Sequence, residues 1–257
     1  MFGRSWRVGR LFGIDIRIDP SWIVIALLVT YTLYVRFGLR FNELGSTSRL
    51  LFAIGLGLLF FGSVLAHELA HALTAKRRGI EVQGITLFLF GGATHARIDS
   101  RGPREELVVS IVGPLSSLIL GGLCLLLAQP LGWPNEPVGW GFGYLGAVNI
   151  LLAVFNMLPG FPLDGGRILR AIVWRVTGSL ERATHIAGIA GQVVGYGLIA
   201  AGVAWLTVDE LGNAIWFAFI GWFLVQAARL SDRELQTREA PDQLVVEEAT
   251  VGEDPKP

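Results

Sequence analysis

The chain has 257 residues, of which 52% are hydrophobic and only 16% are charged, and its mean hydropathy is +0.54. Lysine plus arginine and aspartate plus glutamate number 21 each, so the formal net charge is zero. This composition excludes an ordinary soluble protein, gives no sign of a nucleic-acid partner, and is typical of an integral membrane protein in contact with lipid. The single cysteine, Cys124, excludes an intrachain disulfide.

The first twenty residues mix arginine and aspartate with isolated apolar residues. They lack the continuous apolar segment of a cleavable signal peptide, so we expect them to be retained. Within them, Gly13–Asp19 alternates isoleucines with charged residues. This alternation predicts a half-buried strand lying against the membrane face.

Six apolar segments approach or exceed the ~20 residues that a helix needs to cross a membrane. They are Trp22–Phe37, Leu50–Ala75, Leu107–Leu127, Trp140–Leu158, Ala187–Leu206 and Ala214–Ala228. An even number of crossings puts both termini on one side, and the basic segments beside these spans indicate that this side is the cytoplasm. Arg36, Arg40 and Arg49 in the first outside loop run against the rule. We expect a multi-pass protein of the cell membrane with both termini cytoplasmic.

The second span carries His67, Glu68 and His71 and, from Leu50 to Ala75, no other ionisable residue. Residues four apart lie on one helical face, so the two imidazoles can bind one zinc ion. Zinc lowers the pKa of a water ligand to about 7 and leaves Glu68 to accept a proton as catalytic base. Such a string also occurs by chance on helices that bind nothing, but titratable groups are costly inside a membrane and mark functional sites there.

Between the second and third spans, Ile85–Phe90 is rich in β-branched and aromatic residues and is followed by two glycines. This pattern predicts a strand or hairpin at the membrane edge of the active-site cavity. A protease must extend its substrate, and an exposed strand edge can hold an extended chain. We therefore predict that Leu87, Phe88 and Leu89 bind substrate. The alternative is a strand that only completes the fold.

The segment Asn156–Arg167 contains two prolines and three glycines, which break a helix where an acidic residue, Asp164, appears. Broken helices in membrane proteins usually line a cavity. Asp164 is therefore a candidate third ligand of the zinc ion. The alternative is that Asp164 caps a helix beginning at Gly165. Spacing alone leaves both interpretations open.

Three motifs, in this order along the chain, resemble those of the site-2 protease family of intramembrane zinc metalloproteases. They are His67-Glu68-Leu69-Ala70-His71, Val112-Gly113-Pro114 and Asn156-x-x-Pro159-x-x-Pro162-Leu163-Asp164-Gly165. The resemblance covers Gly9 to about Leu230. It implies one zinc ion per chain, with the ligands His67, His71 and Asp164 and the catalytic base Glu68. It also implies that Asn156 positions substrate, and such an amide can donate to a developing oxyanion.

The chain departs from the family pattern at Ser117, where many members carry asparagine three residues after the proline. This difference bears on how the third span handles substrate and leaves the metal ligands unaffected. His95 is more readily interpreted as a polar loop residue than as an accessory ligand. Some relatives carry PDZ or CBS domains, and we expect neither among these 257 residues.

We expect an all-α polytopic membrane protein of about six transmembrane helices with a small membrane-associated β-hairpin or sheet. Residues 1–230 would form the metalloprotease domain, and residues 231–257 a disordered acidic tail in the cytoplasm. The expected function is regulated intramembrane proteolysis, in which a peptide bond in or near a transmembrane segment of another protein is hydrolysed. One alternative is a metal transporter or sensor, which leaves Glu68 without a task, and another is an inactive homologue that only binds membrane helices. The sequence does not predict the oligomeric state.

Overall fold

The computed structural model describes residues 5–89, 91–96, 101–206, 211–212 and 214–231. The chain divides into two compact units, Met1–Asn156 and Met157–Pro257. Among the described residues, six helices are long and apolar enough to cross a membrane, which confirms the predicted number of spans. The acidic tail predicted for residues 231–257 lies, apart from its first residue, outside the described part of the chain.

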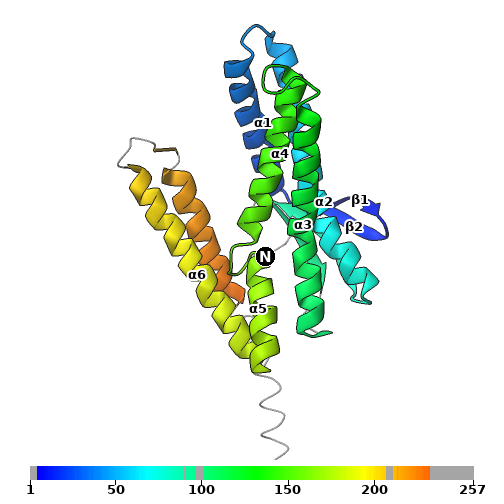
Figure 1. The fold of residues 1–257 in the computed structure, drawn as a ribbon, viewed down its shortest axis with the longest axis vertical. Coiled ribbons are helices and arrows are strands. Elements are labelled where there is room, and N and C mark those ends of the chain that lie inside the picture. The colour runs from blue at the N-terminus through cyan, green and yellow to red at the C-terminus, as the bar shows by residue number, and fades with distance from the viewer. Residues whose placement is uncertain (1–4, 90, 97–100, 207–210, 213, 232–257) are drawn as a thin grey trace, which may run out of the picture. The chain divides into compact units, whose positions relative to one another are not determined.

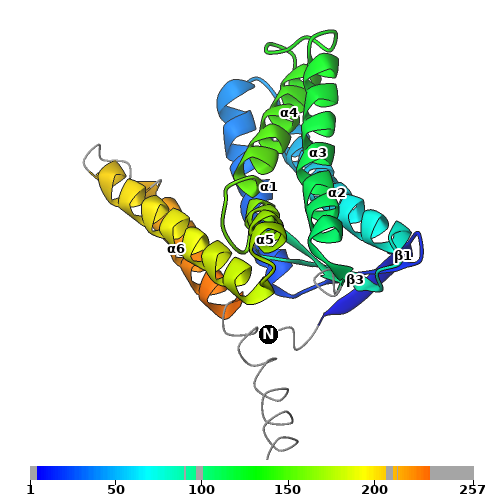
Figure 2. The ribbon, with the colours of Figure 1, turned by 60° about the horizontal axis from the view of Figure 1, so that its bottom comes forward.

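The first unit contains four of these spans. The spans are α1 (Ser21–Arg40), α2 (Ser46–Arg77), α3 (Pro103–Ala128) and α4 (Pro137–Asn156). α2 packs against α1 and α3, and α3 packs against α4, as Figures 1 and 2 both show. Leu33, Leu56 and Leu145 join the helices in one buried cluster. Leu39 and Leu126 are instead exposed, as expected for side chains of a spanning helix that face lipid.

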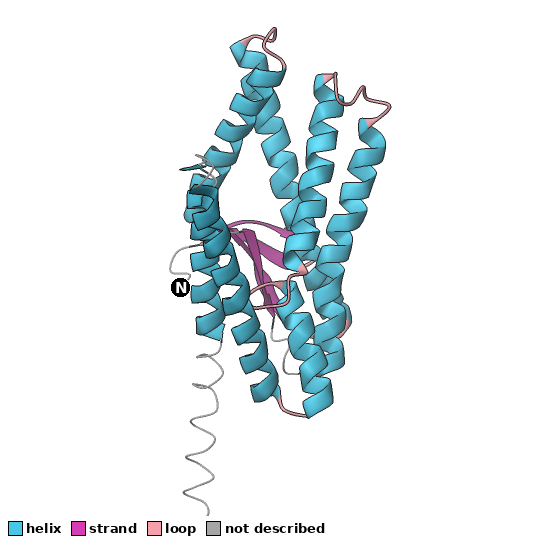
Figure 3. Cartoon of the chain, turned by 60° about the vertical axis from the view of Figure 1, so that its left-hand side comes forward, coloured by secondary structure: helices cyan, strands magenta, loops and turns pink. Residues whose placement is uncertain are grey.

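A four-stranded sheet in the order β1-β2-β3-β4 belongs to the same unit and appears in magenta in Figure 3. The strands are β1 (Trp6–Leu11), β2 (Ile14–Ile18), β3 (Val82–Phe88) and β4 (Gly91–Ala96). β2 and β3 are parallel, and the other neighbours are antiparallel. Ile14 and Ile16 of β2 pack in one core cluster with Val64 and Ala72 of α2. The prediction of a half-buried strand near the N-terminus is therefore confirmed.

The strand predicted between the second and third spans is present, but the assumption that its edge is exposed is wrong. Leu87 of β3 pairs with Ile18 on one side and with Gly92 on the other. Past the strand, the amide of Leu89 donates to the hydroxyl of Ser21 at 3.2 Å. The N-terminal hairpin therefore covers the edge of β3. The bond between Leu89 and Ser21 joins residues 68 positions apart in the sequence. Among the described strands, the edges of the sheet are β1 and β4.

Two helix starts show how the sequence sets local structure. Before α1, Oδ1 of Asp19 accepts hydrogen bonds from the hydroxyl of Ser21 at 2.6 Å and from its amide at 2.9 Å. Both bonds lower the pKa of the Asp19 carboxyl, and the bond from the hydroxyl has the larger effect. α3 begins at Pro103 and has Glu105 and Glu106 in its first turn. Acidic side chains at this end of a helix interact favourably with the helix dipole.

The second unit contains α5 (Asp164–Thr177), α6 (Leu180–Trp205) and a last helix, Ala214–Ser231. α5 packs against α6. The sequence indicates it only in the alternative of a helix beginning at Gly165, one residue later than observed, and its 14 residues are too few to span a membrane. α5 is followed by Gly178, whose φ of 70° is the left-handed conformation typical of the residue after a helix. A Cβ on Gly195 of α6 would lie 2.7 Å from the carbonyl oxygen of Gly221, so glycines let α6 and the last helix approach closely.

Candidate active site

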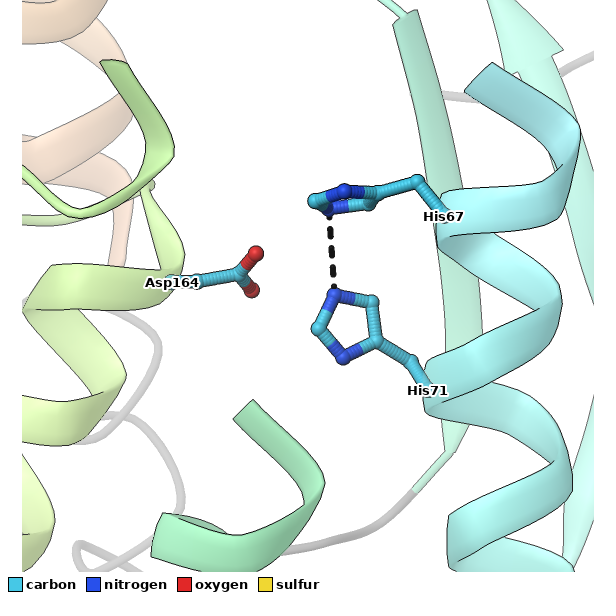
Figure 4. Close-up of side chains that lie close together, drawn as sticks. All are labelled: His67, His71 and Asp164. Carbon is cyan, nitrogen blue, oxygen red and sulfur yellow. Dashed lines mark hydrogen bonds between the residues drawn. The ribbon is translucent and has the colours of Figure 1, made fainter. Parts of the chain in front are cut away.

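The two histidines of α2 are arranged as a pair of metal ligands. Figure 4 shows the imidazoles of His67 and His71 leaving the same side of the helix, and their Nε2 atoms are 3.2 Å apart. Two nitrogen ligands of one tetrahedral zinc ion, each ~2.05 Å from the metal, are separated by about 3.3 Å. The observed spacing therefore fits a single zinc ion without rearrangement of either ring.

α3 supplies a hydrogen-bond partner for the remaining nitrogen of each ring. Nδ1 of His71 donates to the carbonyl oxygen of Val109 at 2.7 Å, and Nδ1 of His67 is 2.9 Å from the hydroxyl of Ser117. A carbonyl oxygen only accepts, so in neutral His71 the proton is on Nδ1 and the lone pair is on Nε2. Partners of this kind fix the tautomer and orientation of metal-binding histidines.

Gly113 of α3 lies directly against the two imidazoles. A Cβ at this position would overlap Nε2 and Cε1 of His71 and would lie 2.8 Å from Nε2 of His67. The following residue, Pro114, has no backbone N–H and interrupts the hydrogen bonding of α3 at this level. The Val-Gly-Pro motif therefore has a steric reason here, because only glycine leaves room beside the histidine pair.

Glu68 faces the sheet, whereas the histidines face α3. Successive residues are turned by about 100° around a helix, and Val64 and Ala72, four residues on either side of Glu68, pack against the sheet. Glu68 is 9% exposed, and its Oε2 accepts a hydrogen bond of 2.7 Å from the hydroxyl of Thr94 in β4. The predicted base is therefore buried on the sheet-facing side of α2, and it is held by a strand residue 26 positions further along the chain.

The predicted substrate-binding residues have different surroundings. Asn156 is the last residue of α4, and its Nδ2 donates to the carbonyl oxygen of Leu152 at 2.9 Å, which uses one of its two N–H groups. Leu87 is buried, whereas Phe88 and Leu89 are partly buried. The backbone of Leu87 is already paired with strands on both sides, so a substrate could reach it only through its side chain. Contact between substrate and Leu87, Phe88 or Leu89 stays a prediction. The side chain of His95 lies outside the described part of the chain.

Asp164 belongs to the second unit and is the first residue of α5, as Figure 4 shows. The N-cap position is occupied by Leu163, so the interpretation of Asp164 as the capping residue is wrong. Two glycines shape the loop before it. A Cβ on Gly165 would overlap the carbonyl oxygens of Met157 and Leu158, and one on Gly166 would overlap the backbone at position 160. The loop therefore folds back onto the start of α5 and presents Asp164 at the turn.

Three contacts at this site are not evident from the sequence. The departure from the family motif at Ser117 predicts an effect on substrate handling, with the metal ligands unaffected, whereas its hydroxyl lies 2.9 Å from Nδ1 of His67, a predicted ligand. The other two contacts are made by Thr94 and by the carbonyl oxygen of Val109. The glycine pair that precedes Thr94 was noted in the sequence, but only as the end of a strand. The signal was the polar residue two positions after Gly92, which lies on the same face of the strand as that glycine.

Comparison with known proteins gives concordant matches. The profile of Peptidase family M50 matches residues 55–133 and 137–199. The protein named "Putative zinc metalloprotease sll0528" from Synechocystis sp. is 41% identical over 252 residues, which cover 97% of this chain and 65% of that protein. "Putative zinc metalloprotease Rip3" from Mycobacterium tuberculosis is 37% identical over 237 residues, which cover 90% of this chain and 60% of that protein. This chain thus spans less than two thirds of the length of these curated relatives.

A solved structure has the same fold. The site-2 protease from Methanocaldococcus jannaschii matches with a TM-score of 0.62 and 28% sequence identity, covering 89% of this chain and 95% of that chain. The profile match extends over more than half of this chain and includes both histidines, Glu68 and Asp164. Together with the six apolar helices, these matches show that the chain is a multi-pass membrane protein belonging to Peptidase family M50, a family of zinc metallopeptidases.

Proposed function

We propose that this chain is a zinc metalloendopeptidase that hydrolyses a peptide bond in or near a transmembrane segment of another membrane protein. The observation that carries the proposal is the geometry of α2. His67 and His71 place two Nε2 atoms 3.2 Å apart, and the adjacent Glu68 has a carboxylate fixed by Thr94. The zinc metalloprotease names of the relatives and the likeness to a site-2 protease support this function.

We propose one zinc ion per chain, with Nε2 of His67, Nε2 of His71 and the carboxylate of Asp164 as its ligands. Two imidazoles and one carboxylate form a donor set suited to a metal ion. Catalytic zinc sites commonly use three protein ligands of these types and keep one position open. When bound, zinc lowers the pKa of a water ligand to about 7 and polarises a substrate carbonyl.

The protein's own groups then have separate tasks. Glu68 accepts the proton of the attacking water and delivers it to the departing amine, the usual work of a general base that becomes a general acid. Val109 and Ser117 keep the imidazoles oriented toward one point. The N–H of Asn156 that does not bond Leu152 donates to the substrate oxygen as it becomes negative.

The proposed cleavage site lies below the membrane surface. Arg77, the last residue of α2, is nine positions after Glu68, which corresponds to a rise of about 14 Å along the helix. Lys76 and Arg77 in the last turn end the apolar segment, and basic residues at span ends favour the cytoplasmic side. We therefore place the chain in the cell membrane with cytoplasmic termini and place cleavage nearer the inner face.

The structure changes the proposed way of holding substrate. A substrate segment must be extended before cleavage, and an extended chain adds most readily to an open strand edge. β3 is interior, whereas β4 is an edge among the described strands and carries Thr94, which bonds the base. We propose that any pairing between the substrate backbone and the sheet occurs along β4.

Cleavage by purified protein tests the proposed function. The zinc-loaded protein in lipid nanodiscs would be mixed with a fusion that contains one transmembrane helix, and products would be identified by mass spectrometry. We expect cleavage by the natural protein and loss of about 100-fold to 10,000-fold in Glu68→Gln, with one zinc ion per chain retained. Zinc flux into sealed vesicles that is equal for both proteins, without cleavage, would instead establish the transporter alternative.

A further inference from the structure

β4 covers the side chain of Glu68 through two residues of the same face. Residues two apart on a strand point to the same side, so Gly92 and Thr94 both face α2. A Cβ on Gly92 would overlap Cγ of Glu68 and would lie 2.9 Å from its Cδ and 3.1 Å from its Oε1. The hydroxyl of Thr94 donates to Oε2 of Glu68 at 2.7 Å. Gly92 thus allows β4 to lie close to the Glu68 side chain, and at this distance the hydroxyl of Thr94 reaches its carboxylate.

The position of Thr94 is fixed by the buried sheet. Thr94 pairs with Ile85 of β3, which has 0% exposed surface and belongs to the core cluster shared by α2 and the sheet. Its hydroxyl is also 3.3 Å from the main-chain carbonyl oxygen of Glu68. A hydroxyl has one proton to donate, and the shorter contact is with the side-chain oxygen, at 2.7 Å. Thr94 therefore holds the carboxylate in place from a rigid part of the fold.

We propose that Thr94 is a positioning residue for the catalytic base, an inference that rests on the role proposed for Glu68. A hydrogen bond to Oε2 fixes the plane of the carboxylate and leaves Oε1 to accept the proton of water. A glutamate has several rotatable bonds, and a general base acts only from within hydrogen-bond reach of its proton. Without the hydroxyl, Glu68 would sample orientations that do not reach the water, and turnover would fall while substrate and zinc still bind.

The competing explanation is structural, because threonine is also a residue that favours strands. Two substitutions separate these roles, because each role predicts a different variant to be the more active. Thr94→Val keeps the branched shape and strand preference but removes the hydroxyl. Thr94→Ser keeps the hydroxyl but removes the methyl group. A positioning role predicts an active serine variant and an impaired valine variant, whereas a structural role predicts the reverse.

The experiment measures kcat, KM and zinc content for the natural protein and the variants in nanodiscs, with the single-helix fusion as substrate. We expect kcat to fall about tenfold to 100-fold in Thr94→Val, with KM and zinc content unchanged, and to change less than about threefold in Thr94→Ser. Thr184→Val serves as the matched control. Its hydroxyl donates within α6 to the carbonyl oxygen of Leu180 at 2.9 Å, so its kcat should equal that of the natural protein.

Unchanged kcat in Thr94→Val, equal losses in the serine and valine variants, or loss of zinc from Thr94→Val would overturn the inference. If Thr94→Val does not fold, the nearly isosteric pair Thr94→Ser and Thr94→Ala decides the question by the same criterion. A natural protein that cleaves nothing would defeat the proposed protease function itself. Cleavage that depends on Glu68 but not on the Thr94 hydroxyl would defeat only this inference.

Discussion

Replacing Gly113 with alanine is expected to remove zinc while leaving the helices folded. The new methyl carbon would overlap Nε2 and Cε1 of His71 and would lie 2.8 Å from Nε2 of His67. Non-bonded heavy atoms settle at about 3.5–4.0 Å. At least one ring must therefore move by more than the ~0.2 Å that metal–ligand distances tolerate.

The expected loss follows from this displacement. Changing a residue that only orients a ligand lowers metal affinity by about tenfold to 100-fold. Moving the ligand atoms themselves should cost more, so we expect zinc affinity to fall at least about 100-fold in Gly113→Ala, equivalent to about 2.7 kcal/mol. Cleavage at limiting zinc should fall in parallel.

Competition with a chromophoric chelator measures the zinc affinity of the purified variant, and circular dichroism checks its helices. Gly122→Ala is the matched control, because it lies in the same helix and a Cβ there meets no atom within 4 Å. Alanine is the better helix former, so this control should bind zinc normally and be at least as stable. Equal zinc affinity in the two variants would show that the space beside Gly113 is not needed for zinc binding.

Three further predictions test other parts of the structure. Ser117→Ala removes the partner of Nδ1 of His67 and should lower zinc affinity about tenfold to 100-fold, whereas Ser116→Ala, which loses a bond within α3, should not. Gly191→Ala places a methyl group against the carbonyl oxygen of Phe161 and should destabilise the second unit by about 1–3 kcal/mol in thermal unfolding, whereas Gly197→Ala, with open space, should not. Hydrogen bonds from Ser21 lower the pKa of Asp19 in the folded protein. Ionised Asp19 therefore stabilises the fold fully above its unfolded pKa of about 3.9, and this stabilisation is lost as the pH falls through the lower folded pKa. Thermal unfolding should show Asp19→Ala less stable than the natural protein near neutral pH, with the difference shrinking as the pH is lowered below about 3.9.

The spanning helices could be predicted from the sequence because each is a local apolar run. All six appear, although α2 extends to Ser46–Arg77 and is longer than its apolar part. The alternation of isoleucines also predicted β2 correctly. α5 is short and carries arginines at intervals, so hydropathy gives no sign of it, and the sequence indicates it only as the helix that Asp164 could cap. The interior position of β3 was missed because it depends on parallel pairing with β2, a contact that no local pattern encodes.

At the site, the sequence predicted the common side of His67 and His71, since a spacing of four residues fixes it. The three-dimensional structure added the groups that hold them. The carbonyl oxygen of Val109 and the hydroxyl of Ser117 come from another helix, and the hydroxyl of Thr94 comes from a strand. Helical periodicity shows which side chains share a face, but it does not show which element lies opposite that face.

The proposed function depends on one zinc ion bound by the histidine pair and the residue at position 164. Zinc K-edge absorption spectroscopy of Asp164→Cys tests it directly, with Cys124, the only natural cysteine, replaced by alanine. We expect one sulfur neighbour at about 2.3 Å together with imidazole nitrogens at about 2.0–2.1 Å. Zinc bound with natural affinity in both Asp164→Cys and Asp164→Ala, with only nitrogen and oxygen neighbours, would contradict it.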